Sequence, residues 1–183
     1  STLNVPEGVS LHNLDVGKDS LKELFMQPFD YIFHFAGQCS VELSYNDPLY
    51  DLDTNLRSTV AIVDLAKNYS SGSHFIYASS MSVYGGNSPF PKDEESLTEG
   101  LNFYAMSKRA SEEYISHYAT NYRLRATCLR LFNVYGPGQN LQNLSQGMIS
   151  IYLAQAIKDG RVLVKGSLDR TRDFIYISDV LDA

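Results

Sequence analysis

Three side chains between positions 80 and 108 could together carry out acid–base chemistry on an alcohol. Ser80 ends an apolar run, and Tyr104 and Lys108 follow it at a spacing of four residues. Side chains at i and i+4 lie on the same face of a helix. A phenol has a usual pKa near 10, so Tyr104 needs a shift of about 3 units, roughly 4 kcal/mol, to act as a base at pH 7. A neighbouring ammonium favours the phenolate, and Ser80 could hold the same alcohol oxygen.

The same residues also have a structural interpretation, in which Tyr104 packs on a sheet and Lys108 points into solvent. A Tyr-x-x-x-Lys match is weak evidence by itself, because the chain contains 13 tyrosines. The order of the surrounding segments favours the chemical interpretation. The serine closes a strand-like run, a polar loop follows, and Tyr104 opens a helix-like segment.

The elements that would position these residues alternate between apolar runs and helical patterns. Strands are expected at residues 30–37, 73–80, 124–132, 161–166 and 173–178, with a short extended segment at 9–16. Helices are expected at residues 18–27, 46–69, 102–122 and 147–160. In the second of these helices, Asp47 is placed as the N-cap and Pro48 as the first helical residue.

Strands that are apolar throughout and separated by helices predict an α/β fold. We expect a doubly wound parallel sheet, Rossmann-like, with helices on both faces. Ligands of such sheets bind at the carboxyl ends of the strands. Here those ends carry small, hydroxyl and amide residues, in the segments HFAGQ, YASSMS and RLFNVYG. The sequence therefore predicts a ligand site along this edge.

Composition excludes several other classes of protein. The net charge of −6, without a basic block, argues against nucleic acid as the main partner. No apolar run approaches the roughly 18 residues that would span a membrane. Cys39 and Cys128 have no metal-binding spacing, the histidines are scattered, and so few thiols indicate a reducing compartment. We expect a cytoplasmic protein without a metal site, and with neither nucleic acid nor membrane as a partner.

Five motifs in the chain resemble those of the extended short-chain dehydrogenase/reductase family, above all its UDP-sugar 4-epimerases. In chain order they are FDYIFHFAG, IYASSMSVYG, YAMSK, LRLFNVYGPGQ and RTRDFIYISDV, and the resemblance runs from Leu14 to Val180. It implies NAD as cofactor and a nucleoside-diphosphate sugar, UDP-linked, as substrate. A bound cationic nicotinamide would then add to the ammonium in favouring the phenolate.

The resemblance also implies roles for individual residues. Catalytic roles fall to Ser80, Tyr104 and Lys108, with the phenol as base. Cofactor contacts, besides those of Tyr104 and Lys108, fall to Asp15 and Val16 at the adenine, Ala36 and Gly37 at the pyrophosphate and ribose, and Asn55 on a neighbouring helix. Substrate contacts fall to Ser80, Asn133 and Arg172, where a guanidinium can bind phosphate oxygens in bidentate fashion. Taken alone, Asn133 suits a turn, Arg172 a surface salt bridge and Asn55 a helix surface.

The residues after Ser80 discriminate between reactions. Family members that dehydrate or decarboxylate nucleotide sugars typically carry acidic residues there, whereas this chain has Met81 and Ser82. This favours epimerisation at C4 through a transient 4-keto sugar. A reductase of 4-keto nucleotide sugars, or a dehydratase, is the alternative within the family. An inactive module that binds a nucleotide or a partner is the alternative from another class.

Part of the family's pattern does not occur in this chain. The glycine-rich loop G-x-x-G-x-x-G and the first strands are missing, so we expect an internal piece of a longer polypeptide, poorly folded and inactive when isolated. Residues 1–136 are predicted to form a partial NAD-binding domain, and 137–183 the start of a nucleotide-sugar-binding portion with a strand that returns to the core. Tyr114, Tyr118 and Tyr122 form a stripe on one helix, which, with the family's pairing of helices, predicts a homodimer.

Overall fold

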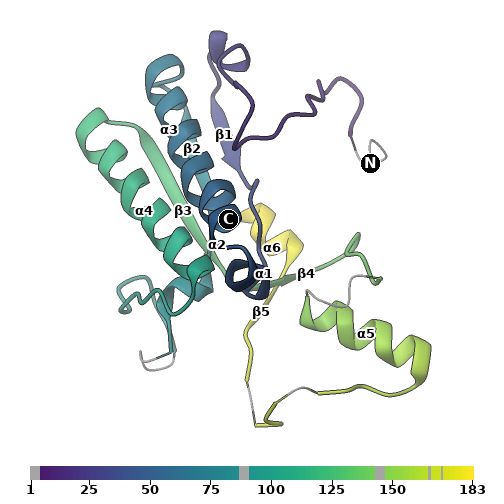
Figure 1. Cartoon of the computed structure of the whole chain (residues 1–183). Helices are drawn as coiled ribbons and strands as arrows, with labels where there is room; N and C mark the ends of the chain where they lie inside the picture. Colours follow the sequence, from purple (N-terminus) through teal and green to yellow (C-terminus); the bar gives the residue numbers. More distant parts are fainter. Residues whose placement is uncertain (1–4, 87–90, 143–146, 165, 170) are drawn as a thin grey trace.

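Three parallel strands form the central sheet of the computed structural model (Figure 1). The structure describes residues 5–86, 91–142, 147–164, 166–169 and 171–183. The strands are β1 (Tyr31–His34), β2 (His74–Ser80) and β3 (Arg125–Leu131), in the spatial order β1-β2-β3. In the register, Tyr77 lies between His34 and Cys128, and Ser80 pairs with Leu131.

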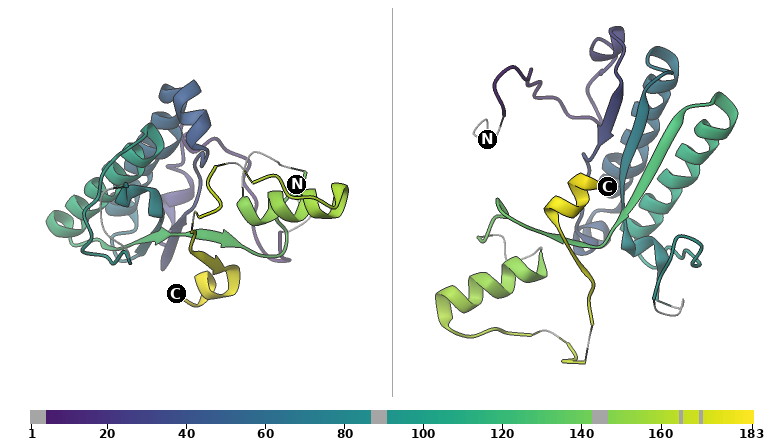
Figure 2. Two further views of the ribbon diagram at one scale, coloured as in Figure 1. Left: turned by 90° about the horizontal axis from the view of Figure 1, so that it is seen from below. Right: turned by 180° about the vertical axis from the view of Figure 1, so that it is seen from behind.

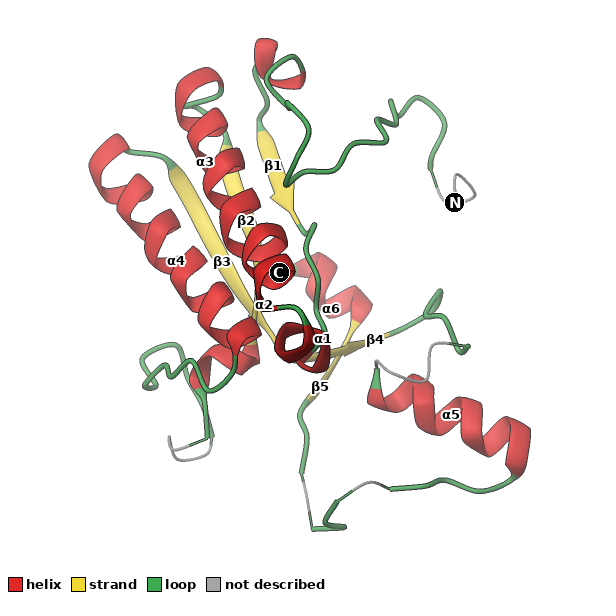
Figure 3. Ribbon diagram, in the orientation of Figure 1, coloured by secondary structure: helices red, strands yellow, loops and turns green. Residues whose placement is uncertain are grey.

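Two long helices cover one face of this sheet. α3 (Ser58–Tyr69) leads into β2, and α4 (Phe103–Tyr122) connects β2 to β3. Since the strands follow one another across the sheet in chain order, right-handed crossovers place both helices on the same side, as Figure 3 shows. The core between the layers contains fully buried side chains from both helices and from β2, among them Val63, Phe75, Tyr77 and Ile115.

The opposite face of the sheet carries exposed aromatic side chains. Tyr31 and Phe33 on β1 are 59% and 60% exposed. Seen from behind, the short helix α6 (Ile177–Asp182) lies on this side, near the lower end of the sheet, while α3 and α4 lie on the other side (Figure 2). The parallel, Rossmann-like α/β fold is confirmed.

The helix expected at residues 46–69 is built from three consecutive pieces. They are α2 (Pro48–Asp51), the π-helical segment η3 (Leu52–Arg57) and α3. Asp47 caps the first piece by accepting a hydrogen bond from the Tyr50 N–H at 2.9 Å, with Pro48 directly after the cap, as predicted. The π-helical segment contains the buried Asn55. Such segments are rare and often mark functional sites.

A second, two-stranded parallel sheet lies beyond β3. It consists of β4 (Asn133–Tyr135) and β5 (Phe174–Tyr176), and α6 (Ile177–Asp182) follows directly. α5 (Met148–Asp159) lies between these strands in the sequence. β4 and β5 pair with each other although the predicted domain boundary at residue 136 lies between them in the sequence. The division into two domains stays a prediction. Among the described helices, none is both long and apolar enough to cross a membrane.

Several local predictions were wrong. The helix expected at residues 18–27 is only the 3-10 turn η2 (Leu24–Met26). Residues 161–164 form no strand, and residue 165 lies outside the described residues. The apolar side chains of this run lack a strand to pair with, and isolated strands are unstable. The short α1 (Val41–Asn46), the 3-10 turn η4 (Met81–Tyr84), β4 and α6 were not predicted.

Candidate active site

Ser80, Tyr104 and Lys108 lie together where β2 ends and α4 begins. The Asn102 side chain caps α4 by accepting from the Ala105 N–H at 2.9 Å, which fixes the first turn that carries Tyr104. Tyr104 and Lys108 are 7% and 6% exposed. The Lys108 Nζ donates to the Ala78 carbonyl of β2 at 2.9 Å and lies 5.9 Å from the centre of the Tyr104 ring. The cap of α4 and its contact with β2 thus bring the phenol and the ammonium to the strand end.

Burial changes the acidity of both groups. It lowers the pKa of Lys108 to about 8, so that most molecules carry the ammonium at pH 7. Burial also raises the pKa of Tyr104, while the Ser80 hydroxyl acts in the opposite direction. Burial outweighs the effect of Ser80, so the pKa of Tyr104 is raised, whereas the sequence predicted a lowering by the neighbouring ammonium.

The Ser80 side chain also caps the short turn that follows it. Its Oγ accepts from the Ser82 N–H at 3.2 Å and lies 3.2 Å from the Ser82 hydroxyl. Met81 and Ser82 both belong to this turn, η4. The two positions that follow the catalytic hydroxyl in sequence therefore offer a thioether and a hydroxyl, and no carboxylate.

A buried carboxylate next to these residues was missed by the sequence analysis. Asp51 is fully buried and accepts hydrogen bonds from the Ser107 hydroxyl at 2.6 Å, from the Asn55 amide at 3.0 Å and from Gln38. It thereby links α2 to α4 and to the loop after β1. Two features of the sequence could have pointed to Asp51. Asp51 and Asn55 are spaced at i and i+4, so they share a helix face, and the hydrogen-bond donor Ser107 directly precedes Lys108.

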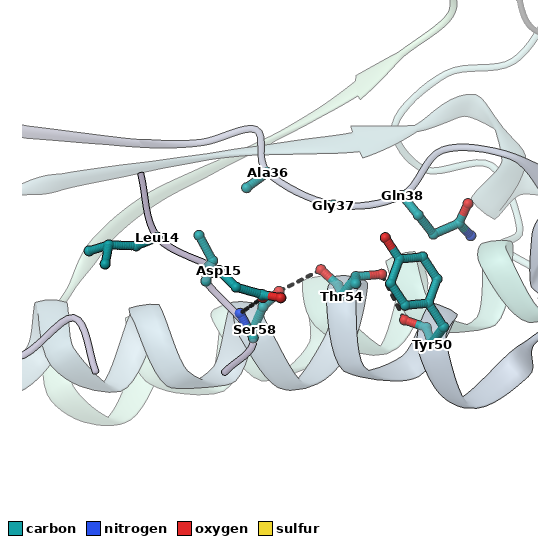
Figure 4. Close-up of a pocket in the computed structure, with 10 residues that line it drawn as sticks. Leu14, Asp15, Ala36, Gly37, Gln38, Tyr50, Thr54 and Ser58 are labelled. Carbon is teal, nitrogen blue, oxygen red and sulfur yellow. Dashed lines mark hydrogen bonds between the residues drawn. The ribbon is translucent and has the colours of Figure 1, made fainter. Parts of the chain in front are cut away.

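A cavity of about 290 Å³ lies beside the carboxyl end of β1 (Figure 4). Four of the residues predicted to contact a cofactor line it: Asp15, Val16, Ala36 and Gly37. Its other lining residues are Leu14, Gly17, Gln38, Tyr50, Thr54 and Ser58. The last three of these follow one another at i, i+4 and i+8 along the helix, a pattern that the sequence analysis did not use.

Asp15 is held at the cavity by local contacts. Its carboxylate accepts from the Gly17 N–H at 3.0 Å and pairs with Lys18 at 3.2 Å. The Gly17 N–H, followed by Lys18, lowers the pKa of this carboxyl below its usual range. Asp15 is therefore an acceptor that faces the cavity and can bind hydroxyl or amide donors.

The cavity wall fits a group that approaches the backbone closely. Gly37 has φ +149°, and a Cβ at this position would lie 2.6 Å from Oδ1 of Asn55. A side chain is therefore excluded here, and the backbone stays open to the cavity. Asn55 Oδ1 is buried, and no described residue donates a hydrogen bond to it. An acceptor without a partner suits a ligand with hydroxyl or amide donors, such as a dinucleotide.

Asn133 and Arg172 lie near β5. Neither residue contacts Tyr104 or Lys108 in the described part of the structure. The Asn133 amide donates to the Asp173 carbonyl at 2.7 Å and lies 3.6 Å from the Met81 sulfur. Asn133 is thus next to the turn that follows Ser80. Arg172 is exposed and donates to the Thr171 carbonyl at 2.8 Å. Its guanidinium forms no ion pair with another described residue.

The sequence matches a model of the NAD dependent epimerase/dehydratase family over residues 1–183. The chain belongs to this family. This confirms the resemblance found in the sequence and, at the level of the family, the prediction of NAD as the cofactor.

Similar proteins of this epimerase/dehydratase family carry out more than one reaction. A putative UDP-glucose 4-epimerase of Methanocaldococcus jannaschii is 31% identical over 98% of this chain and 59% of its own. A GDP-6-deoxy-D-mannose reductase of Pseudomonas aeruginosa is 32% identical over 90% of this chain and 55% of its own. The chain thus spans little more than half the length of these relatives.

Solved structures of sugar-nucleotide epimerases have the same arrangement of elements. A UDP-N-acetylglucosamine 4-epimerase from Methanobrevibacter ruminantium, in complex with UDP-N-acetylmuramic acid, superimposes with a TM-score of 0.84 at 29% identity. The match covers 92% of this chain and 54% of that one. A UDP-glucose 4-epimerase from Thermus thermophilus, in complex with NAD, gives 0.82 at 28% identity over 98% and 60% of the two chains.

Proposed function

We propose that the protein containing this chain is an NAD-dependent 4-epimerase of a nucleoside-diphosphate sugar, with UDP as the nucleotide. The observation that carries the proposal is the cluster of Ser80, Tyr104 and Lys108 at the end of β2, beside a cavity whose wall includes Gly37. Acid–base groups and a recess for a cofactor at the same sheet edge are what oxidation of a sugar alcohol requires.

Each member of the cluster has a role in this reaction. The Tyr104 phenolate accepts the proton of the C4 hydroxyl and returns it after the sugar has turned over. The Lys108 ammonium stabilises the phenolate by its charge, and Ser80 holds the C4 oxygen by a hydrogen bond. NAD, held by the residues around the cavity, would supply a hydride acceptor and donor for C4.

The cofactor would be held by the residues around the cavity. Asp15 and Val16 would bind the adenosine end, and Ala36 and Gly37 would let the pyrophosphate and ribose approach the backbone. Asn55 would offer its buried, unpartnered oxygen to a donor. For the substrate, we propose that Asn133 and Arg172 bind the diphosphate, with Arg172 free to turn towards it because it is exposed.

A reductase of 4-keto nucleotide sugars is the second candidate, because it needs the same three residues. The similarity to a GDP-6-deoxy-D-mannose reductase favours it. A dehydratase fits less well, since Met81 and Ser82 supply no titratable acid beside Ser80. An inactive binding module would have no use for a buried ammonium next to a buried phenol.

The deciding experiment uses the longest natural polypeptide that contains this chain. Proton NMR follows UDP-glucose and UDP-galactose with a trace of NAD. We expect interconversion without net NADH, reduced by about 10²–10⁴-fold in Tyr104→Phe. Tyr69→Phe, at the exposed end of α3, is the matched control and should keep full activity. Stoichiometric oxidation of a nicotinamide cofactor with a 4-keto sugar would favour the reductase, and no turnover in either assay would favour a binding module.

We also propose a homodimer that pairs α3 and α4 of one copy with those of another. The support is an apolar recess of about 700 Å³ between these helices, lined by Leu52, Leu56 and Tyr114 among others. Leu52 and Tyr114 are 44% and 48% exposed. Light scattering should give a dimer for the wild type and a monomer for Tyr114→Glu, and a wild-type monomer would refute the proposal. A cytoplasmic location stays a prediction from the sequence.

A further inference from the structure

The Lys108 ammonium is buried without a carboxylate partner. Its side chain is 6% exposed, and in the described part of the chain it forms no ion pair. Its hydrogen bond to the neutral carbonyl of Ala78 compensates only part of the lost hydration. Burial outweighs the favourable charge effects of Cys39 and Asp51 on this amine, so a further stabilising contact helps to keep it charged near neutral pH.

The ring of Tyr77 is placed to provide it. The Lys108 Nζ lies 4.7 Å from the centre of this ring, closer than the 5.9 Å to the Tyr104 ring. Tyr77 is fully buried on β2, in the strand that also supplies Ala78. An ammonium within about 6 Å of a ring centre is attracted by the electron-rich face, and the attraction grows when water is excluded.

The phenol oxygen of Tyr77 does not explain why an aromatic residue is needed here. It is buried and makes no hydrogen bond of normal geometry with the described residues, although the hydroxyls of Ser111 and Thr59 are near enough to affect its acidity. Burial raises the pKa of Tyr77, so it stays neutral and does not act as an anion. The part of Tyr77 that can stabilise Lys108 is therefore the face of its ring.

We propose that Tyr77 is a positioning residue that holds Lys108 in place and in its charged form through a cation–π contact. The functional importance of this contact rests on the proposed function, in which the charge of Lys108 stabilises the Tyr104 phenolate. Its test, however, needs neither substrate nor cofactor.

Other titratable groups also face Lys108. Burial lowers the pKa of Lys108, whereas Cys39 from the loop after β1 and Asp51 from α2 act to raise it. His34 on β1 also faces this region, and burial keeps it neutral near pH 7 by lowering its pKa to about 4. Because the His34 ring packs against Tyr77, with the ring centres 5.5 Å apart, the test includes a variant that keeps the shape of the ring.

The test is an NMR titration of lysine side chains in the longest natural polypeptide that contains this chain. The Lys108 signal is identified by its loss in Lys108→Met. Tyr77→Phe keeps the ring and removes the unpartnered phenol, so the pKa of Lys108 should stay near 8. Tyr77→Leu removes the ring, and the pKa should fall by about 0.4–1.5 units, which is the usual cation–π range expressed in pH units.

A third variant protects the test against a misfolded Tyr77→Leu. Pentafluorophenylalanine at position 77 keeps the shape of the ring and withdraws its electron density, and it should lower the pKa of Lys108 as Tyr77→Leu does. If the fluorinated ring leaves the pKa of Lys108 unchanged, the cation–π proposal is wrong and Tyr77 only fills space. Failure of the proposed epimerase activity would leave this titration unaffected, so the two proposals can fail separately.

Discussion

The region around the central sheet buries polar and charged side chains, whereas the region from residue 137 onwards leaves apolar ones in solvent. Asp51, Asn55 and Lys108 are 0%, 1% and 6% exposed. In the later region, Ile157 and Leu168 are 70% and 84% exposed, and Ser150 is the one buried side chain among its described residues. The first region therefore has a core that can hold a reaction site in one geometry. The later region, as described, does not bury enough apolar surface to do the same.

The largest expected effect is on the free energy of unfolding when an isoleucine in each region is replaced by alanine. Ile115 on α4 is 1% exposed and belongs to the core, so Ile115→Ala should lower the free energy of unfolding by about 2–5 kcal/mol. Ile157→Ala on α5 is the matched control and should cost less than about 1 kcal/mol. Urea denaturation of the longest natural polypeptide that contains this chain measures both. Equal costs would mean that Ile157 is covered there, and the contrast between the regions would not hold.

A pH effect should follow from the buried histidine of the first region. Burial, with a smaller contribution from Lys108, lowers the pKa of His34 to about 4 from a usual value of 6.5. The unfolded chain therefore binds the proton first, and the stability from neutral His34 is complete above pH 6.5 and is lost as the pH falls towards 4. Between pH 7.5 and 5 the loss is about 2 kcal/mol.

Denaturation at several pH values tests this, with His34→Gln compared to the wild type. The variant should show a flatter fall in stability below pH 6.5, by about that amount. His117→Gln, at an exposed position of α4, should retain the wild-type dependence. A His34→Gln curve parallel to that of the wild type would contradict the assignment.

Two glutamates next to each other on α4 allow a finer comparison within the first region. Glu112 is largely buried and binds Arg130 of β3 through contacts of 2.8–3.1 Å, and it also accepts from the Ser79 hydroxyl at 2.5 Å. Glu113 pairs with Arg109 at 3.2 Å on the surface, with 65% of its side chain exposed. Glu112→Gln should cost about 1–3 kcal/mol, because it leaves the Arg130 charge partly unpaired.

The matched substitution Glu113→Gln should change stability by less than about 0.5 kcal/mol, as exposed pairs usually do. Thermal or urea denaturation distinguishes the two results. Because Arg130 also donates to the Glu94 carbonyl at 3.0 Å, Glu112→Gln should in addition increase hydrogen exchange in the loop before α4. Similar losses in both variants would show that burial does not distinguish these pairs.

The strongest sequence signals correspond to the region with the denser core. The three strands β1, β2 and β3, the two long helices and the cap at Asp47 could be predicted, because apolar periodicity and capping act locally. The failures lie where an element needs a partner from elsewhere. Residues 161–164 have the composition of a strand, but no neighbouring strand pairs with them among the described residues.

The candidate site could be predicted only where the chemistry follows from spacing along one element. Tyr104 and Lys108 lie on one helix, so their proximity was readable in the sequence. The hydrogen bonds of Asp51 to Gln38 and Ser107 join residues from three elements. Such contacts depend on how α4 packs against α2, which no local pattern specifies.

The smallest expected effect compares how the long helix of each region ends. α4 ends at Arg123 with φ 58°, and α5 ends at Gly160 with φ 62°. Glycine adopts this left-handed conformation without strain, while other residues lose about 1–2 kcal/mol in it. Glycine also loses more entropy on folding, so Arg123→Gly should raise the free energy of unfolding by only about 0.5 kcal/mol.

The reverse change, Gly160→Arg, should cost about 1 kcal/mol, but mostly in the local stability of α5. If the later region opens independently of the central sheet, the variant should exchange its α5 amide hydrogens about fivefold faster with an unchanged urea midpoint. Arg123→Gly should instead shift the midpoint, because α4 forms part of the core. A shift of the midpoint in Gly160→Arg would show that the two regions unfold as one unit, and that α5 shares the stability of the core despite its exposed face.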